Sequence, residues 1–262
     1  MKKYFLSIMS LFKNESHILD EWLEHYIKEG VEHFYLMNNN STDNFHGIIE
    51  KYKDKITLYD RPKKHQQVAN YNSIIPEIKK DTEWLLVCDL DEFVFATKNY
   101  KTIPDIIKKF IKEKKNITQI YLPWKMFSSN NHIEQPESVI HGFTDRKHYK
   151  EWNDRNKKYI ILIDSLEKID IHQCKMKNGI SVDPKNKKPN LNGIRLNINE
   201  EELSEYSLHL NHHAIQSYNW FMSVKATRGS VNVRYNCRNQ KYFDEYNKNT
   251  GYEDNLLKNK KY

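Results

Sequence analysis

Two aspartates one residue apart, Asp89 and Asp91, follow an apolar run and are the side chains in this chain best suited to chemistry. Alternate residues of an extended chain point to the same side, so both carboxylates can converge just beyond a strand over 84–87. Two carboxylates held together repel each other unless a cation or a proton compensates them. A divalent cation that keeps some waters and bridges to substrate phosphates is the usual use of such a pair. The alternative is two solvated acids at a strand end.

The elements that must position this pair alternate between strand and helix. Apolar runs predict strands over 4–12, 33–37, 56–59 and 84–87, with helical spacing between them. This alternation is typical of an α/β fold with a mostly parallel, doubly wound sheet flanked by helices. Ligands of such sheets collect beyond the carboxyl ends of the strands. Four polar segments are expected there: 13–15, 38–43, 60–61 and 89–91.

The pattern loosens after about residue 100. A helix is predicted over 103–112 and a strand over 117–123, and the following irregular stretch could form an acceptor site. Because no linker marks a boundary, we expect a single domain over 1–262. Within it, 1–100 is the expected nucleotide-binding half and 101–255 the half that completes the acceptor and metal sites. The end, 256–262, is predicted to be a solvated basic tail.

Composition narrows the class of protein. The chain has 262 residues, 38% of them hydrophobic, and 42 basic against 35 acidic residues give a net charge of +7. That charge favours an anionic partner, and because the basic residues are dispersed we expect a phosphorylated small molecule rather than nucleic acid. Three cysteines without metal-ligand spacing fit a reducing compartment. No apolar run reaches the ~20 residues of a membrane helix and no secretion signal is evident, so a cytoplasmic location is expected.

Four blocks of the sequence, 13–35, 39–43, 67–93 and 212–229, follow one another in an order that covers most of the chain. Together these blocks resemble the glycosyltransferases grouped near families 2 and 92. Those enzymes have a GT-A fold, which is a Rossmann-like sheet with an irregular acceptor-side half. The resemblance implies metal-dependent transfer of a sugar from a nucleotide-sugar donor, expected to be a UDP-sugar, to a glycan or glycoconjugate acceptor.

The resemblance also implies how the donor is held. A divalent cation, Mn²⁺ or Mg²⁺, would bind Asp91 with Asp89 nearby and neutralise the leaving diphosphate. Asp89 would also contact the ribose or reach the metal through water. His212 stands where these families place a late metal ligand or a diphosphate contact, and imidazole favours Mn²⁺. His213 stands where the family commonly shows a tyrosine, so His209, His212 and His213 all stay open as the ligand.

Further donor contacts are expected on both sides of the pair. Lys225 and Arg228 are three residues apart, on one face of a helix predicted to start near Ser217, where they could clamp the diphosphate; the alternative is a solvated face. The remaining nucleotide or donor contacts are expected to be Asn14, Glu15, Asn39, Asp43, Gln67 and Asn70. Glu15 could instead cap the first helix, and Asn39 could instead hold a turn open.

The sequence offers several candidates for a catalytic base. An inverting transferase needs a carboxylate within hydrogen-bond reach of the acceptor hydroxyl, and the family 92 resemblance implies inversion. The segment 122–129 resembles the acceptor side of the family. The candidates are Glu92, Glu137 and Asp145, together with Glu134, Glu151 and Asp154. Glu92 is better suited to orienting the metal pair from behind.

A different enzyme class also uses this motif. Haloacid-dehalogenase-like phosphatases end a buried strand in Asp-x-Asp, with the first aspartate as nucleophile and the second as acid and base. There the motif normally closes the first strand and is followed by Thr or Val two residues on. Here it closes about the fourth strand, and Glu92 and Phe93 follow. The phosphatase is therefore the alternative, and a non-catalytic sugar-nucleotide binder is disfavoured by the intact motif.

Overall fold

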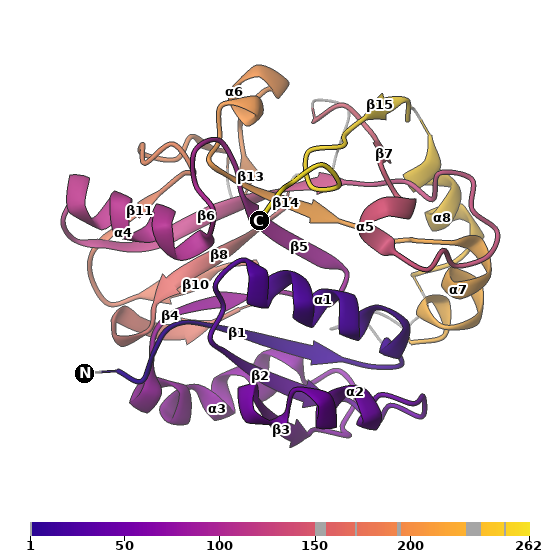
Figure 1. Cartoon of the computed structure of the whole chain (residues 1–262), viewed down its shortest axis with the longest axis horizontal. Coiled ribbons are helices and arrows are strands. Elements are labelled where there is room, and N and C mark those ends of the chain that lie inside the picture. The colour runs from indigo at the N-terminus through magenta and orange to yellow at the C-terminus, as the bar shows by residue number, and fades with distance from the viewer. Residues whose placement is uncertain (1, 150–155, 171, 193–194, 229–236, 249) are drawn as a thin grey trace.

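A nine-stranded sheet forms the centre of the protein in the computed structural model, which describes residues 2–149, 156–170, 172–192, 195–228, 237–248 and 250–262 (Figure 1). Its strands run in the order β3-β2-β1-β4-β8-β6-β14-β5, and β11 pairs with β6. The strands are β1 Tyr4–Phe12, β2 His33–Asn38, β3 Ile56–Asp60, β4 Thr82–Val87, β5 Glu92–Ala96, β6 Ile117–Met126, β8 Lys157–Leu162, β11 Ile180–Val182 and β14 Leu208–His212. The larger helices are α1 Ser16–Lys28, α2 His46–Lys51, α3 Gln67–Asp81, α4 Ile103–Glu113, α7 Tyr218–Ser223 and α8 Gln240–Asn247.

The first four strands are mutually parallel, as predicted. Alternate residues of β4 enter two different cores: Trp84 and Leu86 pack with α1, α2 and α4, whereas Leu85 and Val87 pack with α3. Because period-two alternation sends neighbouring side chains to opposite faces, this division means that helices cover both faces of the sheet. The predicted α/β class with a mostly parallel sheet flanked by helices is confirmed.

Two strands of reversed direction complete the sheet, β8 from the second half of the chain and β5 from the end of the first. β8 lies between β4 and β6 and is antiparallel to both. β5 follows the aspartate motif directly and pairs antiparallel with β14 at the edge, with Phe93 opposite Asn211. The sequence did not predict β5, because its short run begins with a carboxylate and merges with the polar motif before it. β5 turns the chain back immediately after the aspartates.

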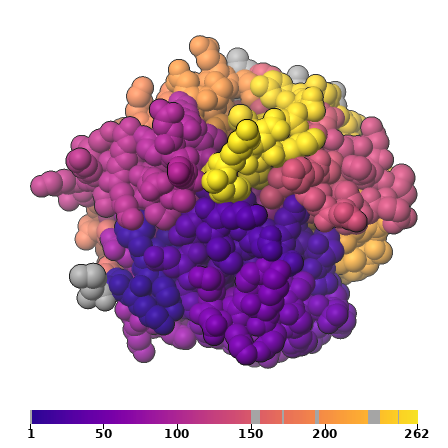
Figure 2. Space-filling model, viewed as in Figure 1, coloured from indigo at the N-terminus to yellow at the C-terminus, as the bar shows by residue number. Residues whose placement is uncertain are grey.

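The C-terminal segment packs onto the body of the protein instead of extending into solvent. Leu257 is buried in the main core, the Lys260 ammonium pairs with the buried Glu29 carboxylate, and Tyr262 Oη lies 3.0 Å from His25 Nδ1. In Figure 2 this yellow segment lies across the surface above the indigo residues of the first half. Most side chains of the predicted solvated tail are exposed, but Leu257 and Lys260 are held by the core and by Glu29, contacts that the sequence did not reveal.

The helices do not provide a membrane span. None of those in the described ranges is both long and apolar enough to cross a bilayer.

Candidate active site

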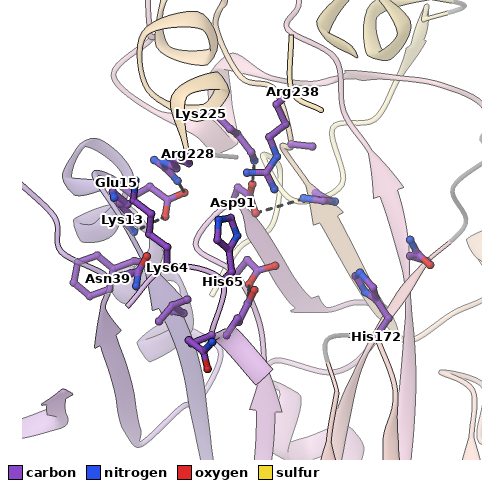
Figure 3. Close-up of a pocket in the computed structure, with 18 of the residues that line it drawn as sticks. Lys13, Glu15, Asn39, Lys64, His65, Asp91, His172, Lys225, Arg228 and Arg238 are labelled. Atoms are coloured by element: carbon purple, nitrogen blue, oxygen red, sulfur yellow. Dashed lines mark hydrogen bonds and ion pairs between the residues drawn. The ribbon is translucent and has the colours of Figure 1, made fainter. Parts of the chain in front are cut away.

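A cavity of about 250 Å³ opens beyond the carboxyl ends of the parallel strands, where the sequence placed its four polar segments (Figure 3). Phe12 ends β1, Asn39 follows β2, Asp89 and Asp91 follow β4, and His212 ends β14; all five line the cavity. The rest of the lining comes from residues 63–67, from residues near α7 and α8, and from Leu11, Lys13, Glu15, Trp124, Asn156, His172 and Ala214. The sheet thus brings together side chains that lie more than 200 residues apart in sequence, from Lys13 to Arg238.

Asp91 lies between two cationic or basic side chains. Its Oδ2 pairs with the Lys225 ammonium, and its Oδ1 lies 3.4 Å from His212 Nε2. Burial opposes ionisation of Asp91, but Lys225 and then His212 hold the pKa of this carboxyl well below its usual range. Asp91 is therefore an anion on the cavity wall whose charge Lys225 compensates.

Asp89 has a different counter-ion. Its Oδ2 lies 2.8 Å from the Lys158 ammonium, and its Oδ1 accepts a 3.2 Å hydrogen bond from Gln67 Nε2. Burial opposes ionisation here too, yet Lys158 lowers the pKa of Asp89. Lys158 is fully buried on β8. Sequence reasoning missed it, and the only signal is a lysine at the start of an apolar strand.

Glu92 lies behind the pair and does not line the cavity. Its Oε2 accepts a 2.9 Å hydrogen bond from the Asp89 N–H and lies 3.4 Å from the Lys158 ammonium. Burial raises the pKa of Glu92 to about 7, outweighing the opposing effect of Lys158. Its position is that of a group that orients Asp89.

The other candidate bases also lie off the cavity wall. Glu137 is exposed, Asp145 accepts a 2.8 Å hydrogen bond from the Gly251 N–H, and Glu134 accepts one from Asn219. Glu151 and Asp154 fall outside the described residues. Across the described ranges, the only carboxylates lining this cavity are Glu15, Asp89 and Asp91.

Lys225 and Arg228 both line the cavity, but not from one face of a helix. α7 ends at Ser223, and after Val224 the residues Lys225–Thr227 form a separate 3₁₀ turn. The helical prediction is wrong here, because a three-residue spacing does not show where a helix ends. The two side chains serve different carboxylates: Arg228 Nη1 lies 3.0 Å from Glu15 Oε1, whereas Lys225 pairs with Asp91.

Glu15 and Asn39 line the cavity with their side chains already engaged. Glu15 occupies the position before α1 and makes no side-chain cap, so its carboxylate is directed to Arg228 instead. Asn39 Nδ2 donates to the carbonyl oxygens of Arg61 at 2.5 Å and Lys63 at 3.0 Å. Asn39 thereby holds the segment that carries Lys63, Lys64 and His65 over the cavity.

Of the remaining residues predicted to contact the donor, one lies on the cavity wall and the others do not. Gln67 is on the wall beside Asp89. Asn14 Oδ1 accepts from the Thr42 N–H at 2.7 Å, and Asp43 Oδ2 accepts from the Ser16 N–H at 2.7 Å. These two side chains tie the loops after β1 and β2 together, and neither they nor Asn70 line the cavity.

Cations outnumber anions on the wall. Six basic side chains line it against the three carboxylates: Lys13, Lys63, Lys64, Lys225, Arg228 and Arg238. Burial, followed by repulsion from Lys64 and Arg228, lowers the pKa of Lys13. Sequence reasoning did not single out Lys63, Lys64 or Arg238, because lysines and arginines in loops carry no spacing signal. Such a wall favours an anionic ligand.

Comparison with known proteins identifies the family. The sequence model of glycosyltransferase family 92 matches residues 2–250. The chain belongs to glycosyltransferase family 92. A family 92 protein of Oryza sativa subsp. japonica is 22% identical over 149 residues, which is 55% of this chain and 25% of that protein. One of Ricinus communis is 24% identical over 149 residues, 55% of this chain and 27% of that protein. The chain thus spans about a quarter of the length of the curated relatives it matches.

Solved structures are more distant from this family 92 chain. S. aureus TarS 1–349 is 20% identical, with a TM-score of 0.40 over 62% of this chain and 47% of that one. Glucosyl-3-phosphoglycerate synthase from Mycobacterium tuberculosis, in complex with Mn²⁺, uridine diphosphate and glucosyl-3-phosphoglycerate, is 10% identical, with a TM-score of 0.34 over 62% and 58%. The phosphatase alternative has no support from the family match.

One of the three histidines left open by the sequence reaches the cavity of the family 92 chain. His212 lines it, whereas His209 Nε2 lies 3.2 Å from the Tyr206 carbonyl oxygen and His213 is buried beside Phe127. No group of three or more His, Cys, Asp or Glu side chains within the described ranges is arranged to hold a metal ion. Asp91 and His212 offer two atoms that can coordinate a metal, which suits a cation whose remaining ligands are waters and substrate phosphates.

Proposed function

We propose that this chain transfers a sugar from a nucleotide-sugar donor, a UDP-sugar, to a glycan or glycoconjugate acceptor, with Mn²⁺ or Mg²⁺ bound between Asp91 and the donor diphosphate. The observation that carries the proposal is the cavity beyond the strand ends, where Asp91 and His212 meet a mainly cationic wall in a family 92 chain. Mn²⁺ and the uridine base rest on the family resemblance and on the imidazole donor.

Each part of the wall has a task in this proposal. Asp91 and His212 would hold the cation, which supplies positive charge to the diphosphate as the sugar–phosphate bond breaks. Lys225 and Arg228 would bind the diphosphate oxygens, Arg228 with two parallel donors. Glu92, through the Asp89 N–H, and Lys158, through the Asp89 carboxylate, keep Asp89 in place beside the donor. Glu137 and Asp145 stay predictions for the base.

Donor binding can be tested by thermal unfolding with a panel of nucleoside diphosphates, each with Mn²⁺ or with a chelator. A ligand that binds only the folded state raises the midpoint by mass action, by about 2.7 kcal/mol of stability at a hundredfold excess over Kd. We expect UDP with Mn²⁺ to give the largest rise and UDP with chelator a smaller one. No rise with any nucleotide, together with a rise for phosphate mimics and Mg²⁺, would refute the proposal.

Asp91→Asn tests the role of the carboxylate in turnover. Loss of the charge should lower sugar transfer or donor hydrolysis by about 10²-fold or more, the scale of losing one key electrostatic contact. The readout is UDP release, with circular dichroism to check folding. Asp54→Asn is the matched control, because Asp54 is exposed and far from the cavity. Full activity of the Asp91 variant would remove this residue from the mechanism.

A further inference from the structure

Two lysines compensate the two aspartates, but only one of them can exchange its partner. Lys158 is fully buried, bonds both Asp89 and Glu92, and does not line the cavity. Lys225 lines the cavity, and in Figure 3 its side chain reaches Asp91 from the 3₁₀ turn above it. Lys225 is also largely buried, with 6% of its side chain exposed, but it lies on the cavity wall, whereas Lys158 is fully enclosed in the sheet.

The Lys225 ammonium occupies the place that a divalent cation needs. It pairs with Asp91 Oδ2, and the other oxygen of the same carboxylate faces His212 Nε2 at 3.4 Å. A cation on these two donors would lie within a few ångströms of the ammonium, and like charges at that distance repel strongly where water is scarce. The repulsion ends only if the ammonium leaves or if an anion enters between the two charges.

A diphosphate removes this conflict because its oxygens can accept both charges. We propose that Lys225 is an internal competitor of the divalent cation at Asp91, so that the cation binds weakly alone and tightly together with a nucleoside diphosphate, which draws the ammonium away from the carboxylate. The inference rests on the proposed function for its diphosphate ligand. Lys225 is thus a residue that couples the binding of the two ligands, a property distinct from clamping the donor.

The test is Mn²⁺ binding itself, measured by the loss of the free Mn²⁺ electron paramagnetic resonance signal without any nucleotide. Lys225→Met and Lys225→Gln remove the competing charge, so their Kd for Mn²⁺ should fall about tenfold, within the usual range of coupling between sites. Lys225→Arg keeps a cation beside Asp91 and should bind Mn²⁺ as weakly as the wild type. Lys64→Met removes one charge from the same wall without touching Asp91 and is the matched control.

A second series adds UDP, with the Mn²⁺–UDP complex in solution measured separately. UDP should tighten Mn²⁺ binding to the wild type, and this gain should shrink in Lys225→Met. If Lys225→Gln, checked to be folded by its thermal transition, binds Mn²⁺ no better than the wild type, the inference is wrong. An equal gain in Lys64→Met would also overturn it, because the effect would then be one of overall charge.

The outcomes separate the inference from the proposed function. If no variant binds UDP but the Lys225 variants still gain affinity for Mn²⁺, the competition is real and the donor assignment fails. If UDP binds and sugar is transferred while Mn²⁺ affinity is unchanged in the Lys225 variants, the function stands and the competition fails. If Lys225→Met and Lys225→Gln do not bind Mn²⁺ at all, the competition is also refuted.

Discussion

At the scale of single residues, Asp89 and Asp91 differ in the accessibility of the cation that compensates each of them. Lys158 holds Asp89 from inside the sheet and also faces Glu92, so one ammonium serves two carboxylates. Asp91 is compensated from the cavity side by Lys225. The two carboxylates of one motif are therefore compensated from different sides: Asp89 by a lysine enclosed in the sheet, Asp91 by a lysine on the cavity wall.

Lys158→Met should destabilise the fold, because it leaves Asp89 and Glu92 without their buried cation. Removing one partner of a buried ion pair costs about 3–5 kcal/mol, to be measured as the free energy of unfolding in urea. Lys168→Met, at an exposed position on the neighbouring short strand β9 (Leu166–Ile169), is the control and should change stability by no more than about 0.5 kcal/mol. If the free energy of unfolding falls equally in both variants, the loss is not specific to the Lys158 ion pairs and the prediction is wrong.

These residues also show what sequence can reveal about a site. The Asp89 and Asp91 pair could be found because both members lie within one strand end and strand geometry fixes their direction. Lys158 was missed, and Lys225 was predicted as a diphosphate contact but not as the counter-ion of Asp91. Both lysines reach the pair only through the order of strands in the sheet and the end of a short helix, which local spacing does not reveal.

At the scale of elements, one side chain on the loop after β2 helps to hold the loop after β3 over the cavity. Asn39 donates two hydrogen bonds to the carbonyl oxygens of Arg61 and Lys63, which places Lys63, Lys64 and His65 on the wall. The sequence predicted the strands β1 to β4 and the helices between them from their apolar spacing, including α3, which continues through Pro76. It left Asn39 with two possible roles, and the structure shows its amide engaged with the loop.

Asn39→Ala should loosen this loop while leaving the sheet intact. Two hydrogen bonds at about 1 kcal/mol each are lost, so amide hydrogen exchange over residues 61–66 should become faster and the Kd for UDP should rise about tenfold. Hydrogen-exchange mass spectrometry and calorimetry provide the two readouts. Asn44→Ala, at an exposed position nearby, should change neither. Unchanged exchange in the Asn39 variant would mean that the loop is held by other contacts.

At the scale of the whole molecule, the C-terminal segment closes over the helices that cover the first strands. Glu29, at the end of α1, is fully buried, accepts a hydrogen bond from the Ala96 N–H at 3.1 Å, and pairs with Lys260. Burial raises the pKa of Glu29 to about 7, although Lys260 opposes the rise. The ion pair that joins the C-terminal segment to the end of the first helix thus involves a carboxylate whose pKa burial raises to about 7.

Stability should therefore depend on pH through Glu29. Unfolded glutamate titrates near pH 4.3, so the folded state binds the proton more tightly and loses stability as the pH rises from about 4 to about 7. Lys260→Met raises this pKa further and deepens the loss. We expect wild type and variant to unfold alike near pH 5 and to differ by about 1 kcal/mol by pH 8, measured by urea unfolding at each pH.

The adjacent Lys261 provides the control for this pH series. Its side chain is exposed, so Lys261→Met should follow the wild type at every pH. A constant difference between Lys260→Met and the wild type from pH 5 to pH 8 would show that Glu29 ionisation is not involved.

The insertion of β8 between β4 and β6 has a consequence for how the protein is made. During synthesis β4 emerges and pairs with β1, but its other edge waits until β8 leaves the ribosome much later. An unpaired strand edge is a site for wrong association, and pairing between distant segments is slow. Because Lys158 belongs to β8, the same delay leaves the acidic motif without its internal counter-charge. Until β8 is synthesised, the growing chain thus has both an unpaired β4 edge and two carboxylates, Asp89 and Glu92, without their buried lysine.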